Sequence, residues 1–170
     1  MPSTNTAART RAASAAAKTP DAITLLTDDH KEVKKRFRQY DKLVKDGAEA
    51  SEREALAAEI CTMLTVHAQI EEEILYPAAR ETLPEPDLVD EAAVEHASAK
   101  ELIAQIEAMA GDDELYDAKV KVLGEYIDHH VKEEQDEMFP KLRRKIDIKA
   151  IGEQLLRRKE QLMAEQEAVH

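Results

Sequence analysis

Residues 67–77 read HAQIEEEILYP, and residues 130–140 repeat the pattern as HVKEEQDEMFP. Each copy begins with His, places Glu four residues later (Glu71 and Glu134), and reaches an aromatic residue and a proline at the same offset. Residues four apart lie on one face of a helix, a turn from each other. Imidazole nitrogen and carboxylate oxygen are ligands that suit iron, manganese or zinc. The repeat therefore predicts two helical turns that each offer a His and a Glu to a metal.

Length and composition indicate a single helical domain. The 170 residues are enough for a core, and Ala, Glu, Leu, Lys and Arg are abundant, with 4 Gly and no Trp. The net charge is −12, so we expect neither nucleic acid nor an anionic membrane as a partner. Cys61 is the only cysteine, which excludes an intrachain disulfide, and no apolar run approaches the ~18 residues of a membrane span. These features favour a cytoplasmic protein.

Apolar residues recur at alternating steps of three and four, the spacing of bundle helices. The first expected helix runs from the cap Asp21 to Gly47, and the third runs from the cap Asp87 to Gly111. The second begins at Ser51, where Glu54 completes a capping box, and should kink or end near Pro77. The fourth runs from residues 112–113 to Pro140. Short connections predict an all-α, up-down-up-down four-helix bundle over residues 21–145. An additional C-terminal helix, within residues 146–170, follows Asp147 and either packs on the bundle or pairs with another subunit.

Residues 1–20 form an N-terminal segment that is rich in Ala, Ser and Thr. The segment has no Leu, Ile, Val or Phe before Pro20, so it has no apolar face to bury, and we expect a disordered tail. Its basic, Ser-rich composition also fits an organelle transit peptide, although its arginines show no amphipathic spacing.

Each of the four expected bundle helices carries one histidine on its apolar seam. These residues are His30, His67, His96 and His130. Burial of Glu71 and Glu134 beside them would cost several kcal/mol each without a compensating charge, and the seams hold no Arg or Lys to supply one. A metal pair would compensate. The alternative interpretations are that both glutamates lie in solvated acidic runs at the edge of the bundle, and that His129 replaces His130.

The series His30, His67-x-x-x-Glu71, His96, His130-x-x-x-Glu134 resembles the signature of the hemerythrin-like (HHE cation-binding) domain family. The resemblance covers about residues 21–145. It implies a hemerythrin-like bundle with a non-haem diiron centre, in which two iron ions share an oxo or hydroxo bridge. It also implies that the four histidines are terminal ligands, that the two glutamates bridge the ions, and that the chemistry involves O2, H2O2 or NO.

One position departs from the oxygen-carrying hemerythrins, which have a fifth His one turn beyond the third-helix ligand. Lys100 stands there in this chain. The iron pair would then be more open, or be completed by water, His129 or a nearby Tyr. Binding or reduction of small oxidants in a stress response is the leading hypothesis. The alternatives are a sensor or iron-handling module that signals to a protein partner or works as a homo-oligomer, and a metal-free helical scaffold.

Overall fold

The described part of the chain is almost wholly helical. A computed structural model describes residues 19–169, which contain helices and turns but no strand. The elements are α2 (Ala22–Lys45), α3 (Ala50–Ile70), η1 (Glu71–Leu75), α4 (Tyr76–Thr82), α5 (Pro86–Ala108), α6 (Tyr116–Glu133), η2 (Glu134–Met138), α7 (Phe139–Leu142) and α8 (Ile148–Ala168). The predicted all-α class is confirmed. Residues 1–18, which contain nearly all of the predicted tail, and His170 lie outside the described residues.

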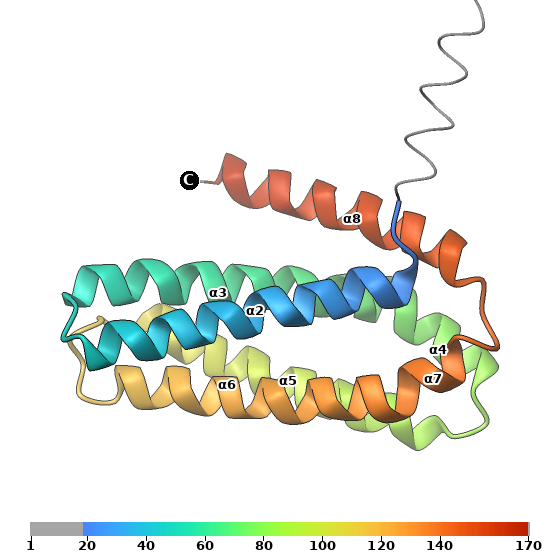
Figure 1. The fold of residues 1–170 in the computed structure, drawn as a ribbon, viewed down its shortest axis with the longest axis horizontal. Helices are drawn as coiled ribbons and strands as arrows, with labels where there is room; N and C mark the ends of the chain where they lie inside the picture. The colour runs from blue at the N-terminus through green and yellow to red at the C-terminus, as the bar shows by residue number, and fades with distance from the viewer. Residues whose placement is uncertain (1–18, 170) are drawn as a thin grey trace, which may run out of the picture.

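The four long helices form an antiparallel bundle (Figure 1). Helix α2 packs against α3 and α6, and α5 packs against the same two helices, so each long helix has two neighbours in the ring. The short connections at residues 46–49, 83–85 and 109–115 force each helix to run opposite to the one before it. This is the predicted up-down-up-down arrangement. No helix in residues 19–169 has the length and apolar character needed to cross a membrane.

Two helices begin where the sequence predicted, the first at the predicted cap Asp21 and the last after Asp147. The Asp21 side chain accepts the N–H of Thr24 at 2.8 Å, and the Asp147 side chain accepts the N–H of Ala150 at 3.1 Å. The first helix ends at Lys45, and Gly47 then adopts a φ of 69°, a left-handed conformation that glycine takes without a steric penalty. The sequence therefore located the beginning of α2 and of α8 correctly.

The predicted capping box of Ser51 and Glu54 is wrong. Helix α3 begins one residue earlier, at Ala50, and its cap residue makes no side-chain hydrogen bond. The Glu54 carboxylate instead accepts the N–H of Gly111, which lies three residues beyond the end of α5. The reason is tertiary: the turn after α5 comes close enough to offer an unpaired N–H to this carboxylate.

Two other predicted helix starts are also displaced. Helix α5 begins at Pro86 rather than after Asp87, because proline fits the first helical turn, where its missing N–H breaks no bond. Helix α6 begins at Tyr116 rather than at residues 112–113. The Asp113 side chain accepts a backbone N–H two residues later at 2.9 Å, which stabilises a turn instead of a helix start.

The acidic residues of both repeat copies form π-helical segments, η1 and η2, that sequence reasoning missed. In η1, the N–H of Tyr76 bonds to the carbonyl of Glu71, five residues earlier instead of four. The sequence predicted a kink or an end of the helix near Pro77; the helix does not end there but continues as α4, with the proline in its first turn. The same geometry precedes Pro140 in the second copy. The wider turn accommodates a proline in a continuing helix and changes which residues share its inner face.

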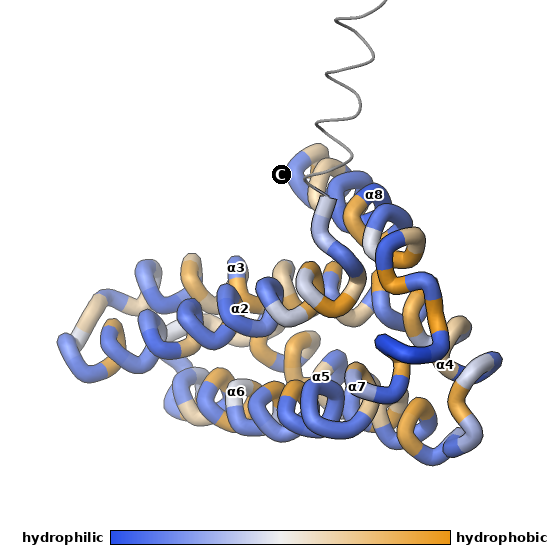
Figure 2. Tube along the Cα trace, turned by 45° about the vertical axis from the view of Figure 1, so that its right-hand side comes forward, coloured by the Kyte–Doolittle hydropathy of each residue, from blue (hydrophilic) through white to orange (hydrophobic). Residues whose placement is uncertain are grey.

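Helix α8 lies across one side of the bundle at an angle to the other helices (Figure 2). It packs on α2, α3 and η1. Arg158 Nε donates to Glu73 of η1 at 2.7 Å, and Lys159 Nζ donates to Asp29 of α2. At the start of α8, Gly152 meets the backbone of residues 20–22 so closely that a Cβ there would lie 2.5 Å from the Pro20 carbonyl oxygen.

Gly152→Ala is therefore expected to lower the free energy of unfolding by roughly 1–3 kcal/mol, because the clash is with backbone that has no room to move. Gly124→Ala is the matched control. A Cβ at Gly124 would lie 3.2 Å from the Phe37 ring, a side chain that can shift, and the change gains about 1 kcal/mol of helix propensity. Thermal denaturation of both variants measures the difference, and an equal melting temperature would contradict the close packing of α8.

Candidate metal centre

The bundle brings the predicted histidines and glutamates into one layer. Each long helix supplies one imidazole, and the first residue of each π-helical segment supplies a carboxylate. We call this set the His/Glu layer; it consists of His30, His67, Glu71, His96, His130 and Glu134. Apart from His67, all of these residues are buried, and Glu71 has no exposed surface. The layer separates two apolar clusters of the core, one toward α4, α7 and α8 and the other toward the far ends of the long helices.

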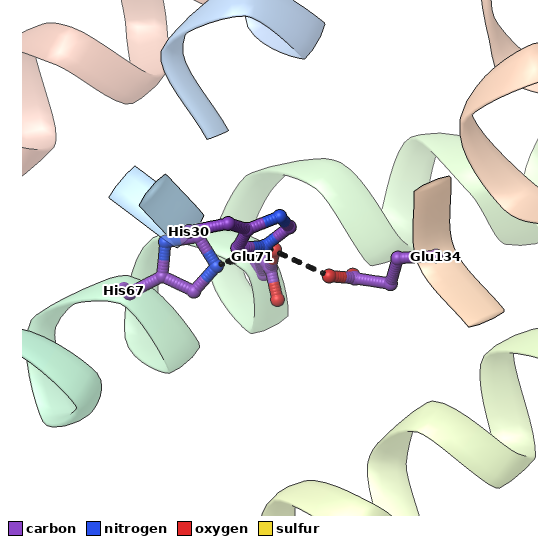
Figure 3. Close-up of side chains that lie close together, drawn as sticks. All are labelled: His30, His67, Glu71 and Glu134. Atoms are coloured by element: carbon purple, nitrogen blue, oxygen red, sulfur yellow. Dashed lines mark hydrogen bonds and ion pairs between the residues drawn. The ribbon is translucent and has the colours of Figure 1, made fainter. Parts of the chain in front are cut away.

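One half of the layer joins α2, α3 and the carboxylates of η1 and η2. The Nε2 atoms of His30 and His67 lie 3.2 Å apart, and His67 Nε2 lies 2.9 Å from Glu71 Oε1. Glu134 Oε1 lies 3.3 Å from His30 Nε2. Figure 3 shows that these side chains converge on a common space from different elements. Their four ligand atoms lie within 4.8 Å of one another, close enough to share a metal ion.

The other half joins α5, α6 and the carboxylate of η1. The Nε2 atoms of His96 and His130 lie 3.0 Å apart, and His96 Nε2 lies 3.2 Å from Glu71 Oε2. Glu134 Oε1 is 3.3 Å from His130 Nε2. The two oxygens of Glu71 thus face different histidine pairs, and Glu134 Oε1 lies close to one imidazole of each pair. The layer thus contains two adjacent groups of side chains that could each hold a metal ion, and the two groups share Glu71.

Each imidazole is oriented by an acceptor that holds its Nδ1 atom. The acceptors are Gln135 for His30 at 2.7 Å, Asp29 for His67 at 3.0 Å, Glu72 for His96 at 3.1 Å and Glu95 for His130 at 3.0 Å. Because these oxygens only accept, Nδ1 carries the hydrogen and Nε2 of a neutral ring turns a lone pair inward. Sequence reasoning missed these residues. A signal was present, since Asp29 and Glu95 each precede a layer histidine, and Glu72 and Gln135 each follow a layer glutamate.

The layer fits a metal because its inward atoms are acceptors that lack donors. Glu71 Oε1 and Glu134 Oε1 are buried and have no hydrogen-bond donor among the described residues, despite their short distances to imidazole nitrogens. Histidines are their only charged partners in residues 19–169. Two uncompensated carboxylates in a bundle interior cost several kcal/mol. Cations between the Nε2 and carboxylate atoms would remove that cost, and this nitrogen and oxygen donor set suits iron, manganese or zinc.

In the protein without metal, protons take the place of the missing cations. Burial alone would lower the pKa of His67, but Glu71 and Asp29 outweigh it and raise that pKa to about 10. Burial is likewise outweighed at His130, where Glu134 and Glu71 raise the pKa to about 11. Burial raises the pKa of both glutamates, yet the facing histidines hold it below the ordinary value. The layer therefore binds protons strongly when it has no metal.

Tyr76 is a further residue of the layer that the sequence did not single out. Its hydroxyl donates to Glu71 Oε2 at 3.0 Å and to Glu134 Oε2 at 2.9 Å, and it lies 3.2 Å from His96 Nε2. Burial, with the two carboxylates, raises the pKa of this phenol well above its ordinary value, so it keeps its proton. The equivalent residue of the other copy is Phe139, whose ring stacks on His30 at 6.0 Å. The two halves of the layer thus differ by one hydroxyl.

His129 and Lys100 do not enter the layer. The side chain of His129 is 67% exposed and lies beside Glu133 on the outer face of α6, so the structure turns His130 inward instead. Lys100 is exposed as well, and its Nζ binds both oxygens of Glu72, at 2.7 and 2.6 Å. Lys100 therefore acts on His96 through Glu72.

A cavity of about 690 Å³ borders the layer on the side away from α4 and α7. The four histidines form one part of its wall. Apolar side chains form much of the rest, among them Val33, Leu64, Ile103 and Ile127. The wall thus combines an apolar part next to the histidines with charged side chains such as Glu59, Lys100 and Lys159.

Comparison with known proteins agrees with this arrangement. The family described as hemerythrin HHE cation binding domain matches residues 21–142. The chain belongs to this family. Together, membership of this cation-binding family and the buried His/Glu groups support a metal-binding function.

A solved relative supports the fold of this hemerythrin-like domain. The crystal structure of a hemerythrin HHE cation binding domain-containing protein from Mycobacterium kansasii matches with a TM-score of 0.72 and 22% sequence identity, and the match covers 86% of this chain and 89% of that one. A DNA nickase from Nostoc sp. is 34% identical over 80 residues, which are 47% of this chain and 22% of the nickase. The chain thus spans a minor part of that relative, and its nicking activity is not carried over.

Metal binding should release protons, because the imidazoles of His67 and His130 carry them up to a pKa of about 10 and about 11. Competition from protons is strongest at low pH and fades as pH rises toward these values. We expect the overall constant for filling both positions to rise by up to about 100-fold per pH unit between roughly pH 6 and 9, the slope for two protons. Anaerobic calorimetry in buffers of different ionisation enthalpy measures the protons released; a heat independent of the buffer would contradict this account.

Proposed function

We propose that this protein holds two iron ions in the His/Glu layer and binds or reduces small oxidants (O2, H2O2 or NO) in a cytoplasmic stress response. One observation carries the proposal. Six buried or nearly buried ligand side chains turn acceptor atoms toward one another, and two of the carboxylate oxygens have no donor in the described structure. Cations are the chemical species that such an arrangement lacks.

The proposed ligand sets follow the two halves of the layer. His30 and His67 would hold one ion, and His96 and His130 would hold the other. Glu71 and Glu134 would bridge the ions, since each lies near imidazoles of both pairs. A mixed set of imidazole and carboxylate ligands suits iron. Bound iron would supply Lewis acidity and electrons for an oxidant.

The chain itself would supply access and a proton. The cavity beside the layer, much of whose wall is apolar, has room for neutral molecules of the size of O2, NO or H2O2. Tyr76 holds a proton on its hydroxyl oxygen within 3.0 Å of Glu71 and 2.9 Å of Glu134. A phenol in this position can donate that proton to an oxidant bound in the layer.

The position of Lys100 favours reaction over reversible oxygen carriage. Its side chain pairs with Glu72 at the surface, so this position supplies no fifth imidazole to the layer. A centre with four imidazoles instead of five keeps one more coordination position open to an oxidant or to water. Open coordination positions favour turnover of a bound oxidant.

Sensing is a second candidate function, because one helix connects the layer to the surface. Lys159 of α8 binds Asp29, and Asp29 holds the Nδ1 of His67. A change of charge in the layer would alter the field at Asp29, and through Lys159 it would bias the docking of α8. A protein partner could read that helix. Hydrogen exchange of the oxidised and reduced protein tests this role. We expect the amide protection of α8 to differ between the two states, and identical exchange patterns would exclude a sensing role.

Metal content and oxidant consumption test the main proposal together. Protein purified without chelator, or reconstituted anaerobically with Fe²⁺, should hold about two irons per chain, as expected for a diiron site. His67→Ala should lose iron together with peroxide or NO consumption, whereas Gln161→Ala, an exposed change on α8, should retain both. Equal rates in His67→Ala would contradict the proposal. A double change of His67 and His130 to Leu that leaves metal content and melting temperature unaltered would favour the metal-free scaffold.

Tyr76→Phe tests the proton-donor role separately. Loss of the hydroxyl should leave about two irons per chain but lower the rate of peroxide reduction by roughly 100-fold, the lower end of general acid catalysis. Tyr116→Phe, at a buried tyrosine of the apolar cluster that lies toward the far ends of the long helices, is the matched control and should keep the wild-type rate. An unchanged rate in Tyr76→Phe would exclude the hydroxyl as the proton donor.

A further inference from the structure

A second group of potential metal ligands lies on the outer face of the α5–α6 pair. His129 and Glu133 are one turn apart on α6, and Glu95 extends from the neighbouring α5. His129 Nε2 lies 3.1 Å from Glu133 Oε1 and 3.6 Å from Glu95 Oε2. We call these three residues the outer cluster. They offer one nitrogen and two oxygens within 4.8 Å of one another, a set suited to a divalent transition-metal ion with water in its other positions.

The outer cluster shares a residue with the His/Glu layer. Glu95 Oε1 accepts from His130 Nδ1 at 3.0 Å, and the other oxygen of the same carboxylate faces His129. Glu95 therefore has two roles, as the support of a layer imidazole and as a ligand-type group of the outer cluster. An ion bound at the outer cluster would be separated from the layer by one carboxylate and one imidazole.

A comparison with the equivalent carboxylates shows that Glu95 lacks a cation. Asp29, which supports His67, binds Lys159, and Glu72, which supports His96, binds Lys100 through both oxygens. Each of these supporting carboxylates is thus balanced by an ammonium group. Among the described residues, Glu95 has only histidines as charged partners. The place that a lysine fills elsewhere is occupied here by His129 and Glu133.

The surroundings of the outer cluster add negative charge. It lies in a hollow of about 400 Å³ that Asp90, Glu91 and Val94 also line, with no Lys or Arg in its described wall. Asp90 pairs with Arg80 at 2.7 Å outside that wall, whereas Glu133 pairs only with His129 in the described structure. A cation would relieve the repulsion between the carboxylates of Glu95 and Glu133, which converge on one imidazole.

We propose that Glu95, His129 and Glu133 bind a divalent transition-metal cation, distinct from the ions of the His/Glu layer. The ligand atoms are Glu95 Oε2, His129 Nε2 and Glu133 Oε1, and water completes the coordination. The site is open to solvent, so it exchanges its ion more readily than the buried layer. Through Glu95, its occupancy acts on the His96–His130 half of the layer.

Zinc binding to four versions of the full chain tests the proposal. Wild type, His129→Gln, Glu133→Gln and Glu101→Gln are each dialysed to equilibrium against Zn²⁺ over a range of concentrations, and bound zinc per chain is measured. Glu101→Gln is the matched control, because it removes one exposed carboxylate of α5 that makes no described contact with the cluster. We expect His129→Gln and Glu133→Gln to bind one zinc fewer than wild type and Glu101→Gln. Equal stoichiometry and affinity in all four proteins would overturn the proposal.

The design separates this site from the proposed diiron centre. The layer contributes the same number of ions to all four proteins, so only the difference between them reports on the outer cluster. If the layer binds no metal, wild type should still bind one zinc that His129→Gln loses. Circular dichroism and melting temperature check that the variants fold, which their exposed positions favour.

Discussion

The structure depends on the two carboxylates of Glu71 and Glu134, which are held in the middle of an apolar bundle. Among the described residues no Lys or Arg pairs with them, and their neighbours are imidazole nitrogens and the Tyr76 hydroxyl. Without metal, protons on His67 and His130 stabilise this arrangement, as the raised pKa of each imidazole indicates. Two cations would replace those protons and satisfy the remaining lone pairs. The charge balance of the layer thus couples folding, protonation and metal binding.

The residues around the layer explain how it is kept in position. A supporting acceptor orients each imidazole, and two of these acceptors bind a lysine in turn, so the layer is connected to the surface by chains of three groups. One chain ends on Lys159 of α8, which makes the C-terminal helix part of the support of the layer. Helix α8 also covers the apolar cluster next to the layer. Its close approach at Gly152 fixes where that support lies.

The two halves of the bundle are similar in sequence but not equivalent in chemistry. Tyr76 brings a hydroxyl to the layer, whereas Phe139 at the matching position brings an apolar ring. The carboxylates that support His67 and His96 are balanced by lysines, while Glu95 faces His129 instead. The half that contains His96 and His130 therefore has both the proton donor and the connection to the outer cluster. Such asymmetry gives two neighbouring metal positions different surroundings.

The sequence by itself determined the helices, their antiparallel order and the six residues of the layer, because helical spacing and a duplicated His-x-x-x-Glu pattern are local properties. It also located the cap of α2 and the start of α8, because each depends on one aspartate side chain and a nearby N–H. Only the tertiary structure decided the partner of Glu54, the supporting acceptors and the separate position of His129, since each depends on residues that are distant in the chain. The π-turns belong to the same class: a proline allows several local outcomes, and packing of Tyr76 and Phe139 against the layer selected one of them.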